Sequence, residues 1–269
     1  MTIRNMLIMA LLMSAAGNCA AQGLRISTQI FSRSNAIAED QVVGSSLTLC
    51  HSGRVYDYVA TADELVIYDP VGKRCRLLNF ARGMVTTVTF DEIRHEMEHQ
   101  VRRTNAVLTE ISSSPGDAAT VEHLRFQLQP SFAENFSAAD GIMTLTAKHL
   151  SYRIRTCPWE NADQIEDYLE YRDWAAQLNS VLHPGSLFPE SRMAVNESLR
   201  KVSRVPVSVE LQHHQPPGIR LRAEHRFTKG LTPDDQALIA RWEQMQEPGR
   251  MRDVPLLKYQ QEILVSGNP

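Results

Sequence analysis

The sequence predicts an α+β fold, in which one large curved antiparallel sheet has its apolar face covered by helices. Short segments of alternating apolar and polar residues recur along the chain between turn residues, which is the pattern of antiparallel strands. Segments with helical spacing of apolar residues stand between these groups of strands. The 269 residues are enough for one domain with a large core.

The first 21 residues have the composition of a secretory signal peptide. Arg4 supplies the positive charge, residues 6–13 are apolar, and small residues lead to a cleavage site after Ala21. The apolar segment is too short to span a bilayer, which takes about 20 residues. We therefore expect a periplasmic or secreted protein. A lipoprotein anchored through Cys19 is the less favoured alternative, because Asn18 stands where a lipobox has Gly, Ala or Ser.

The charge balance is slightly acidic, with 28 Lys and Arg against 31 Asp and Glu. No basic stripe indicates a nucleic-acid surface, and no cationic amphipathic helix indicates a membrane surface. No segment after the signal peptide has the length and hydropathy of a transmembrane helix. The cysteines left after cleavage are Cys50, Cys75 and Cys157, an odd number that cannot be fully paired within one chain.

Residues 45–80 carry the clearest pattern, short strand-like segments that tight turns join into a meander. The turns set a register in which Cys50 lies opposite Val55, Val55 opposite Tyr68, and Tyr68 opposite Cys75. Cys50 and Cys75 are then about 14 Å apart, too far for a disulfide, so we expect free thiols. Because side chains alternate between faces, one face of the meander is apolar. It comprises Leu47, Leu49, Tyr56, Tyr58, Leu65, Ile67 and Leu78.

The rest of the chain mixes strand and helix patterns. The predicted strands lie at residues 84–89, 124–129, 132–137, 142–147 and 150–155, with a hairpin over 205–227. The predicted helices lie at residues 91–111, 161–182 and 189–203, with one more that begins after the N-cap Thr232. Beyond residue 246 the pattern fades, so we expect a single domain over residues 22–246 and a C-terminal tail over 247–269.

One motif on the first of these helices is typical of zinc peptidases. His95, Glu96 and His99 match the H-E-x-x-H pattern, in which two histidines bind zinc and the glutamate acts as the base. Arg102 and Asn105 stand where the extended pattern needs Gly and a third His. Glu122, the candidate for a glutamate from a second helix, lies in a segment with a strand-like pattern, and no N-E-x-x-D-type segment follows. The third ligand is therefore missing from the positions where known patterns place it.

A helical wheel gives a second reason to doubt the zinc site. Ile93, Met97 and Val101 fall between about 0° and 80°, whereas His95 and His99 fall near about 200° and 240°, on the opposite side. We therefore expect the histidines to face solvent. A zinc-dependent hydrolase that uses His95, Glu96 and His99 is kept as the alternative function.

The other candidates for chemistry have simpler structural interpretations. His213 and His214 lie in a Pro-rich turn, where a polar loop is expected, and His225 fits a hydrogen-bonded histidine at the core or its rim. Cys157 has no protease signature around it, and the chain has neither a G-x-S-x-G elbow nor a phosphate-binding glycine loop. We assign no catalytic residue, no metal ligands and no cofactor.

Several stretches resemble a group of exported bacterial proteins. They are "GRVYDYVATADELVIYDPVGKRCRLLN" through "TTVTFDEI", "YRDWAAQLN", "RMAVNESLRK" and "VPVSVELQ…IRLRAEHRFTKGLTPDD". That group is similar in organisation to the LolA-like lipoprotein-carrier fold, a half-barrel whose concave face is covered by helices. The resemblance implies a protein that holds acyl chains or other apolar ligands in the cell envelope. It carries no ligand contact over to an individual residue of this chain.

We therefore expect an exported, non-enzymatic protein that binds a hydrophobic ligand, a lipid or a lipoprotein component, and that binds no nucleic acid. An incomplete barrel leaves apolar sheet surface that helices or a ligand must cover. The expected ligand-binding residues are the apolar face of the meander: Leu47, Leu49, Tyr56, Tyr58, Leu65, Ile67 and Leu78. A purely structural envelope protein with a fully packed core is the other alternative.

Overall fold

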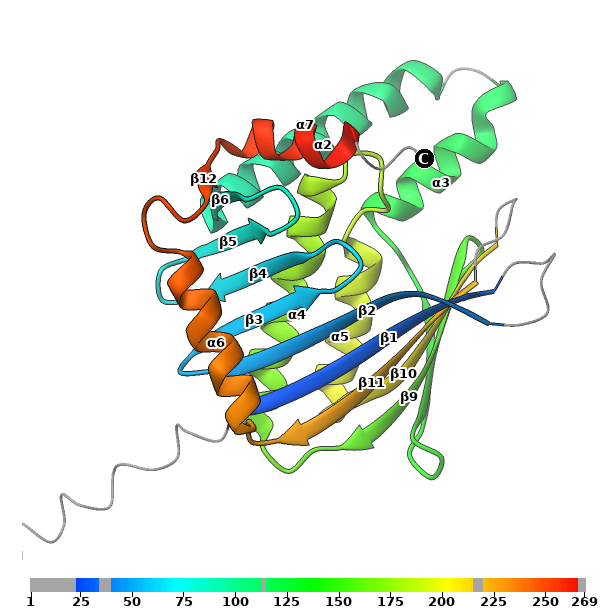
Figure 1. Cartoon of the computed structure of the whole chain (residues 1–269). Coiled ribbons are helices and arrows are strands. Elements are labelled where there is room, and N and C mark those ends of the chain that lie inside the picture. Colours follow the sequence, from blue (N-terminus) through cyan, green and yellow to red (C-terminus); the bar gives the residue numbers. More distant parts are fainter. Residues whose placement is uncertain (1–22, 34–39, 113–114, 215–219, 266–269) are drawn as a thin grey trace, which may run out of the picture.

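The structure, a computed structural model, describes residues 23–33, 40–112, 115–214 and 220–265. The predicted signal peptide and Cys19 lie outside the described residues. The described chain forms one 12-stranded sheet and six α-helices (Figure 1), which confirms the predicted α+β class. None of these helices is long and apolar enough to cross a membrane.

The sheet is open and almost entirely antiparallel. Its spatial order is β12-β6-β5-β4-β3-β2-β1-β11-β10-β9-β8-β7, and only the short β12 pairs in parallel, with β6. The strands are β1 (Leu24–Arg33), β2 (Gln41–His51), β3 (Arg54–Val59), β4 (Glu64–Asp69), β5 (Arg74–Asn79), β6 (Met84–Thr89), β7 (Ala133–Ser137), β8 (Ile142–Thr146), β9 (Leu150–Pro158), β10 (Arg204–His213), β11 (Arg220–Lys229) and β12 (Arg252–Asp253).

Helices cover both faces of this sheet. They are α2 (Phe90–Ile111), α3 (Ala118–Leu128), α4 (Ala162–Leu182), α5 (Glu190–Val202), α6 (Pro233–Met245) and α7 (Leu256–Val265), with a 3₁₀ turn η1 (Pro115–Asp117) before α3. Helices α4 and α5 lie behind the sheet in Figure 1, and α6 lies across its front. We call the side that carries α4 and α5 the helix face, and the other side the α6 face.

The meander β2–β5 has the predicted register. Cys50 pairs with Val55, Val55 with Tyr68, and Tyr68 with Cys75. The turn between β2 and β3 has positive φ at both central residues, 50° at Ser52 and 73° at Gly53. Such a two-residue turn matches the twist of the strands, and Gly adopts this conformation without steric cost.

The core has clusters on both faces of the sheet. On the helix face, Leu77 of β5 shares a buried cluster with Ile93 of α2 and Leu178 of α4. A second cluster on the same face joins strands β8–β10 to α4 and α5. On the α6 face, residues of β2–β6 are buried together with Ile239 and Trp242 of α6. The predicted apolar face therefore has a helical cover, and so does the opposite face.

The helix that carries the H-E-x-x-H motif has the predicted orientation. It begins at a capping box, in which the Thr89 side chain accepts from the backbone of Glu92 and the Glu92 side chain accepts from the backbone of Thr89. The apolar stripe is buried, with Ile93 0% and Met97 8% exposed. His95 and His99 are exposed on the other side, so the wheel prediction is confirmed.

The predicted strand at residues 124–129 is wrong, because this segment belongs to helix α3. Alternation of Leu124, Phe126 and Leu128 suggested a strand. However, Val121, Leu124 and Leu128 are also spaced three and four residues apart, as one face of a helix requires. The helix uses this spacing, and Val121 is its buried residue.

Two segments that the sequence analysis left without structure also belong to the domain. Strand β1 was not predicted, although Leu24 and Ile26 alternate with polar residues and are 3% and 1% exposed. The expected C-terminal tail instead forms β12 and α7. Val254, between these two elements, is 5% exposed, and Tyr259 of α7 is 0% exposed. The apolar residues of this C-terminal segment are few and widely spaced, so they show no periodic pattern. Their burial depends on contacts with β6 and α2, which lie far away in the sequence.

Candidate functional site

The seven residues predicted to bind a ligand lie on one face of the sheet, as the register requires. Five of them have almost no exposed surface: Leu49, Tyr56, Leu65, Ile67 and Leu78 are 0%, 3%, 0%, 3% and 0% exposed. Leu47 and Tyr58 are partly exposed and pack at the border of the same cluster. Only these two offer surface to a ligand in this conformation.

Helix α6 is the cover over the five buried residues. Trp242 lies against two of the predicted aromatic residues, with ring centroids 6.3 Å from Tyr56 and 5.9 Å from Tyr58. A capping box at Thr232 and Asp235 starts the helix, and Arg25 of β1 donates to the Asp235 carboxylate at 3.2 Å. The helix is therefore anchored to the sheet near its first turn as well as through its apolar side.

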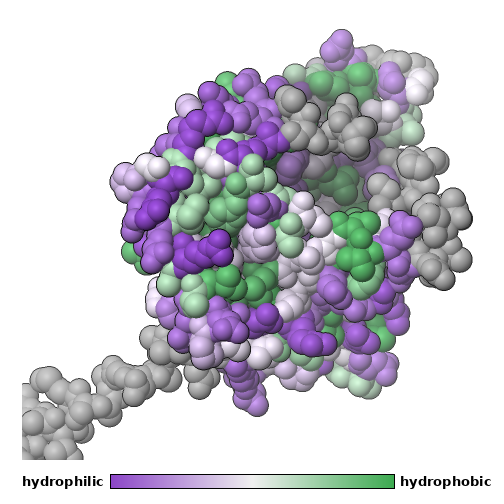
Figure 2. Space-filling view, in the orientation of Figure 1, coloured by the Kyte–Doolittle hydropathy of each residue, from purple (hydrophilic) through white to green (hydrophobic). Residues whose placement is uncertain are grey.

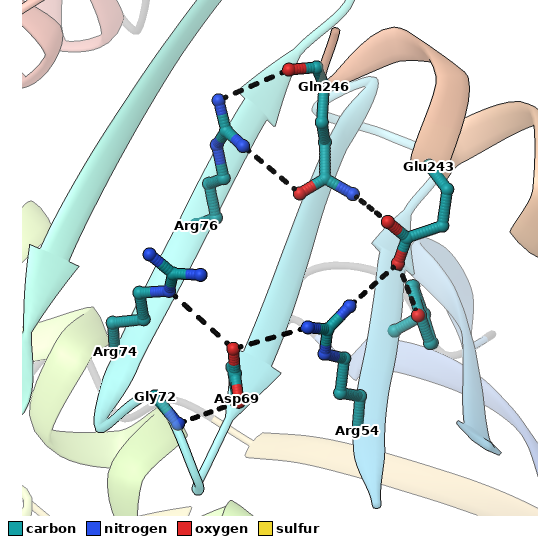
Figure 3. Close-up of polar contacts among 8 residues, drawn as sticks. Arg54, Asp69, Gly72, Arg74, Arg76, Glu243 and Gln246 are labelled. Atoms are coloured by element: carbon teal, nitrogen blue, oxygen red, sulfur yellow. Dashed lines mark hydrogen bonds and ion pairs between the residues drawn. The ribbon is translucent and has the colours of Figure 1, made fainter. Parts of the chain in front are cut away.

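The C-terminal end of α6 is held by a set of polar contacts (Figure 3). Glu243 accepts hydrogen bonds from the Tyr56 hydroxyl at 2.5 Å and from Arg54 at 3.3 Å. Arg76 donates to the side chain of Gln246 at 3.4 Å and to its backbone carbonyl at 3.5 Å. Arg54 also pairs with Asp69 at 3.5 Å, which connects this end of the helix to the turn after β4.

Part of the apolar face extends beyond the cover. Leu47, Tyr58, Phe80, Met245 and Met251 are only partly buried and pack around the α6 cluster. Figure 2 shows apolar surface on this side of the molecule, between α6 and α7. We call these five residues the apolar strip. An apolar molecule lying along α6 has this surface available, with the buried residues supporting it from below.

The described residues give the H-E-x-x-H motif no third ligand. Glu122 lies on helix α3 and not on a strand as expected, but it pairs with Lys148. Both histidines are exposed on α2. Within the described part of the chain, no group of three or more His, Cys, Asp or Glu residues is placed to hold a metal ion.

The described cysteines are free thiols, as predicted for Cys50 and Cys75. Burial, with smaller contributions from Asp167 and Asp57, raises the pKa of Cys50 to about 12. Burial also raises the pKa of Cys75 to about 12. Since the thiolate is the nucleophile, neither cysteine has the activated character of a catalytic one.

The helix face holds a polar centre that the sequence analysis did not find. It contains Arg172 of α4 and Arg192 of α5, and the Nε of Arg172 and the Nε and Nη2 of Arg192 are buried. Among the described residues, none of these three nitrogen atoms has a hydrogen-bond partner. Buried charged groups are normally paired, because an unpaired one loses its hydration without compensation. The burial of these two guanidinium groups without hydrogen-bond partners is therefore unusual.

The electrostatics differ between the two arginines. The pKa of Arg192 is lowered by burial first and by the neighbouring charge of Arg172 second. Burial also acts against the charge of Arg172, but Tyr168, Tyr171 and Asp57 outweigh it, so the pKa of Arg172 is raised. Arg192 is thus the less compensated of the two cations.

Nearby carboxylates are already engaged. Asp57 is 8% exposed and accepts hydrogen bonds from Thr48 at 2.8 Å and from the Tyr171 hydroxyl at 2.5 Å. Asp173 accepts from Asn196 at 2.6 Å and from Arg200 at 2.7 Å. Asp173 also lines a cleft of about 590 Å³ between α2, α4 and α5, together with Arg200.

His225 of β11 lies close enough to Arg172 and Arg192 for their charges to act on it. Its Nδ1 is 2.9 Å from the Thr28 hydroxyl of β1. Burial, followed by the charges of Arg172 and Arg192, lowers the pKa of His225 to about 3. The ring is therefore neutral at pH 7 and adds no further positive charge. The hydrogen bond to Thr28 confirms the histidine predicted at the core or its rim. The two arginines lie on separate helices and carry no local sequence signal.

Comparison of the sequence with models of known protein families finds no match, and comparison with curated proteins finds none either.

Proposed function

We propose that this chain is an exported, non-enzymatic protein that binds a hydrophobic ligand, a lipid or a lipoprotein component, in the cell envelope. The observation that supports the proposal best is the apolar strip beside α6, formed by Leu47, Tyr58, Phe80, Met245 and Met251. Exposed apolar residues that lie together on one face mark a binding surface more often than residues that are scattered singly.

The strip suits an extended apolar chain better than a compact polar molecule. The rings of Tyr58 and Phe80 lie 6.3 Å apart, centroid to centroid. The Tyr58 hydroxyl donates to Asp63 at 2.8 Å, so its polar end is satisfied and its ring is left for apolar contact. Two methionines complete the strip, and their flexible side chains adapt to ligands of different shape.

The proposal is tested by purifying the full-length gene product from the cell envelope and identifying apolar molecules by native mass spectrometry and lipid extraction. Leu47→Glu places a carboxylate on the strip, and we expect it to abolish copurification of the ligand. Val71→Glu is the matched control, because Val71 is also apolar but is 91% exposed at a turn away from the strip.

The wild-type protein and Val71→Glu are expected to carry the same molecule in the same amount. The proposal fails if the wild type carries no apolar molecule, or if Leu47→Glu carries as much as the control. Circular dichroism of both variants establishes that each is folded before the comparison is made.

A further inference from the structure

We propose that Arg172 and Arg192 form a binding site for an oxyanion, a carboxylate or phosphate group, on the helix face of the sheet. The site lies on the opposite face of the sheet from the apolar strip. It therefore stands or falls independently of the proposed hydrophobic ligand.

Burying the two charges without partners destabilises the fold. An isolated guanidinium that leaves water loses several kcal/mol of hydration, which hydrogen bonds and opposite charge must offset. Within the described part of the chain, Arg192 has two buried nitrogen atoms without a partner, and Arg172 has one. A second cation close by makes the arrangement less favourable still, which the lowered pKa of Arg192 reflects. A bound anion removes both costs at once.

The carboxylates of the surrounding elements do not fill this role. Asp57 on β3 and Asp173 on α4 are each held by two other donors. Glu190, two residues from Arg192 on α5, lines the outer cleft between α2, α4 and α5. Asp57 and Asp173 act on the arginines electrostatically. However, no carboxylate among the described residues forms a direct ion pair with Arg172 or Arg192.

The chemistry of the surrounding groups selects an oxyanion. Two guanidinium groups present planar forks of N–H donors, which match the paired oxygens of a carboxylate or phosphate. The phenol groups of Tyr152 and Tyr168 interact electrostatically with Arg192, and His225 is neutral. A cation would be repelled by the arginine pair, and a neutral polar molecule would leave the charge unbalanced.

The experiment uses the full chain in a buffer without phosphate or carboxylate. Inorganic phosphate, acetate and octanoate are each added against sodium chloride of equal ionic strength, and binding is followed by thermal unfolding and isothermal titration calorimetry. We expect phosphate or octanoate to raise the unfolding midpoint of the wild type above the chloride control. A larger effect of octanoate than of acetate assigns the anion to a long-chain molecule, and a larger effect of phosphate assigns it to a phosphate group.

Arg192→Met tests whether the anion binds where the structure indicates. Methionine fills similar space without charge, so we expect about a tenfold to a hundredfold loss of affinity, as for the loss of a charge-assisted contact. Without ligand, the variant should be at least as stable as the wild type, because an unpaired buried charge has been removed. Arg155→Met is the control, since Arg155 is exposed on β9, and it should bind like the wild type.

Two results overturn the proposal. One is a wild-type midpoint that no probe moves beyond the chloride control. The other is an equal response in the wild type and Arg192→Met. If Arg192→Met does not fold, Arg192→Lys replaces it: the charge is kept and the planar fork is lost, so weaker binding than in the wild type is expected, and unchanged binding contradicts the site.

Discussion

Two buried polar groups on the helix face behave in opposite ways. Asp57 is fully hydrogen-bonded, because Thr48 of β2 and Tyr171 of α4 each donate to one of its carboxylate oxygens. Arg192 is not, because its buried Nε and Nη2 have no hydrogen-bond partner among the described residues. Fully satisfied networks hold elements in place, whereas a buried polar group without a partner requires a specific explanation, such as a bound ion. Because of this contrast, we propose a structural role for Asp57 and an anion-binding role for Arg172 and Arg192.

The hydrogen bonds of Asp57 lead to a prediction about stability. Tyr171→Phe removes the donor at 2.5 Å from Asp57 and leaves a buried carboxylate oxygen unsatisfied. We expect the free energy of unfolding to fall by about 1–3 kcal/mol, measured by urea denaturation. Burial and Asp57 hold the pKa of Tyr171 well above its usual value, so the phenol remains a donor over the accessible pH range.

Tyr58→Phe is the matched control. The Tyr58 hydroxyl also donates to a carboxylate, at 2.8 Å to Asp63, but the side chain is partly exposed, so water replaces the lost contact. Equal losses in the two variants would contradict the structural role assigned to Asp57.

At the scale of elements, the two C-terminal helices hold the sheet from different sides. Helix α6 covers the apolar face of the meander, whereas α7 adds Tyr259 to the cluster that joins the meander to α2 and α4. The Tyr259 hydroxyl donates to Glu64 at the beginning of β4, at 2.5 Å. The last helix of the described chain is therefore part of the core.

A pair of substitutions in α7 tests this position in the core. Tyr259→Ala removes a side chain that is 0% exposed, and we expect it to lower the free energy of unfolding by about 3–5 kcal/mol. Leu257→Ala, two residues away, removes a side chain that is 65% exposed and should change stability by no more than about 0.5 kcal/mol. If both variants unfold at the same urea concentration as the wild type, α7 is not part of the cooperative unit.

The sequence predicted those elements whose pattern is local. The meander register follows from short turns of fixed length, and the caps of α2 and α6 follow from single threonines. Helix α3 was mistaken for a strand because six alternating residues fit both periods. Strand β1 showed the same alternation as its neighbours and could have been found. The C-terminal segment could not, because its contacts lie far away in the sequence.

At the scale of the whole molecule, covering both faces of the sheet changes where a ligand can bind. The sequence identified the apolar face of the meander, but it could not show that α6, more than 150 residues further along the chain, covers most of it. The arginine pair was equally out of reach, because α4 and α5 follow one another in the chain and the sequence does not show which of their faces meet. Local periodicity predicts which face of a strand or helix is apolar, but only the tertiary fold shows which of these faces remain exposed to a ligand.

The same packing predicts how the molecule responds to acid. The pKa of His225 is lowered to about 3 by burial and by Arg172 and Arg192, whereas an unfolded histidine titrates near about 6.5. Between these values the unfolded chain binds a proton that the folded chain does not, so acid favours unfolding. The contribution of this residue to stability is fully present above about pH 6.5 and is lost at about 1.4 kcal/mol per pH unit as the pH falls toward 3.

His225→Gln separates this effect from the protonation of carboxylates, which destabilises the fold in the same direction. Glutamine keeps polar atoms within reach of Thr28 but cannot gain a proton, so we expect its stability to fall less steeply than that of the wild type between about pH 6.5 and 4. His95→Gln, an exposed position on α2, should follow the wild-type curve. Urea unfolding at half-unit pH intervals measures all three slopes. Parallel curves for the wild type and His225→Gln would mean that the polar centre admits protons freely, which contradicts a buried pair of cations beside a neutral histidine.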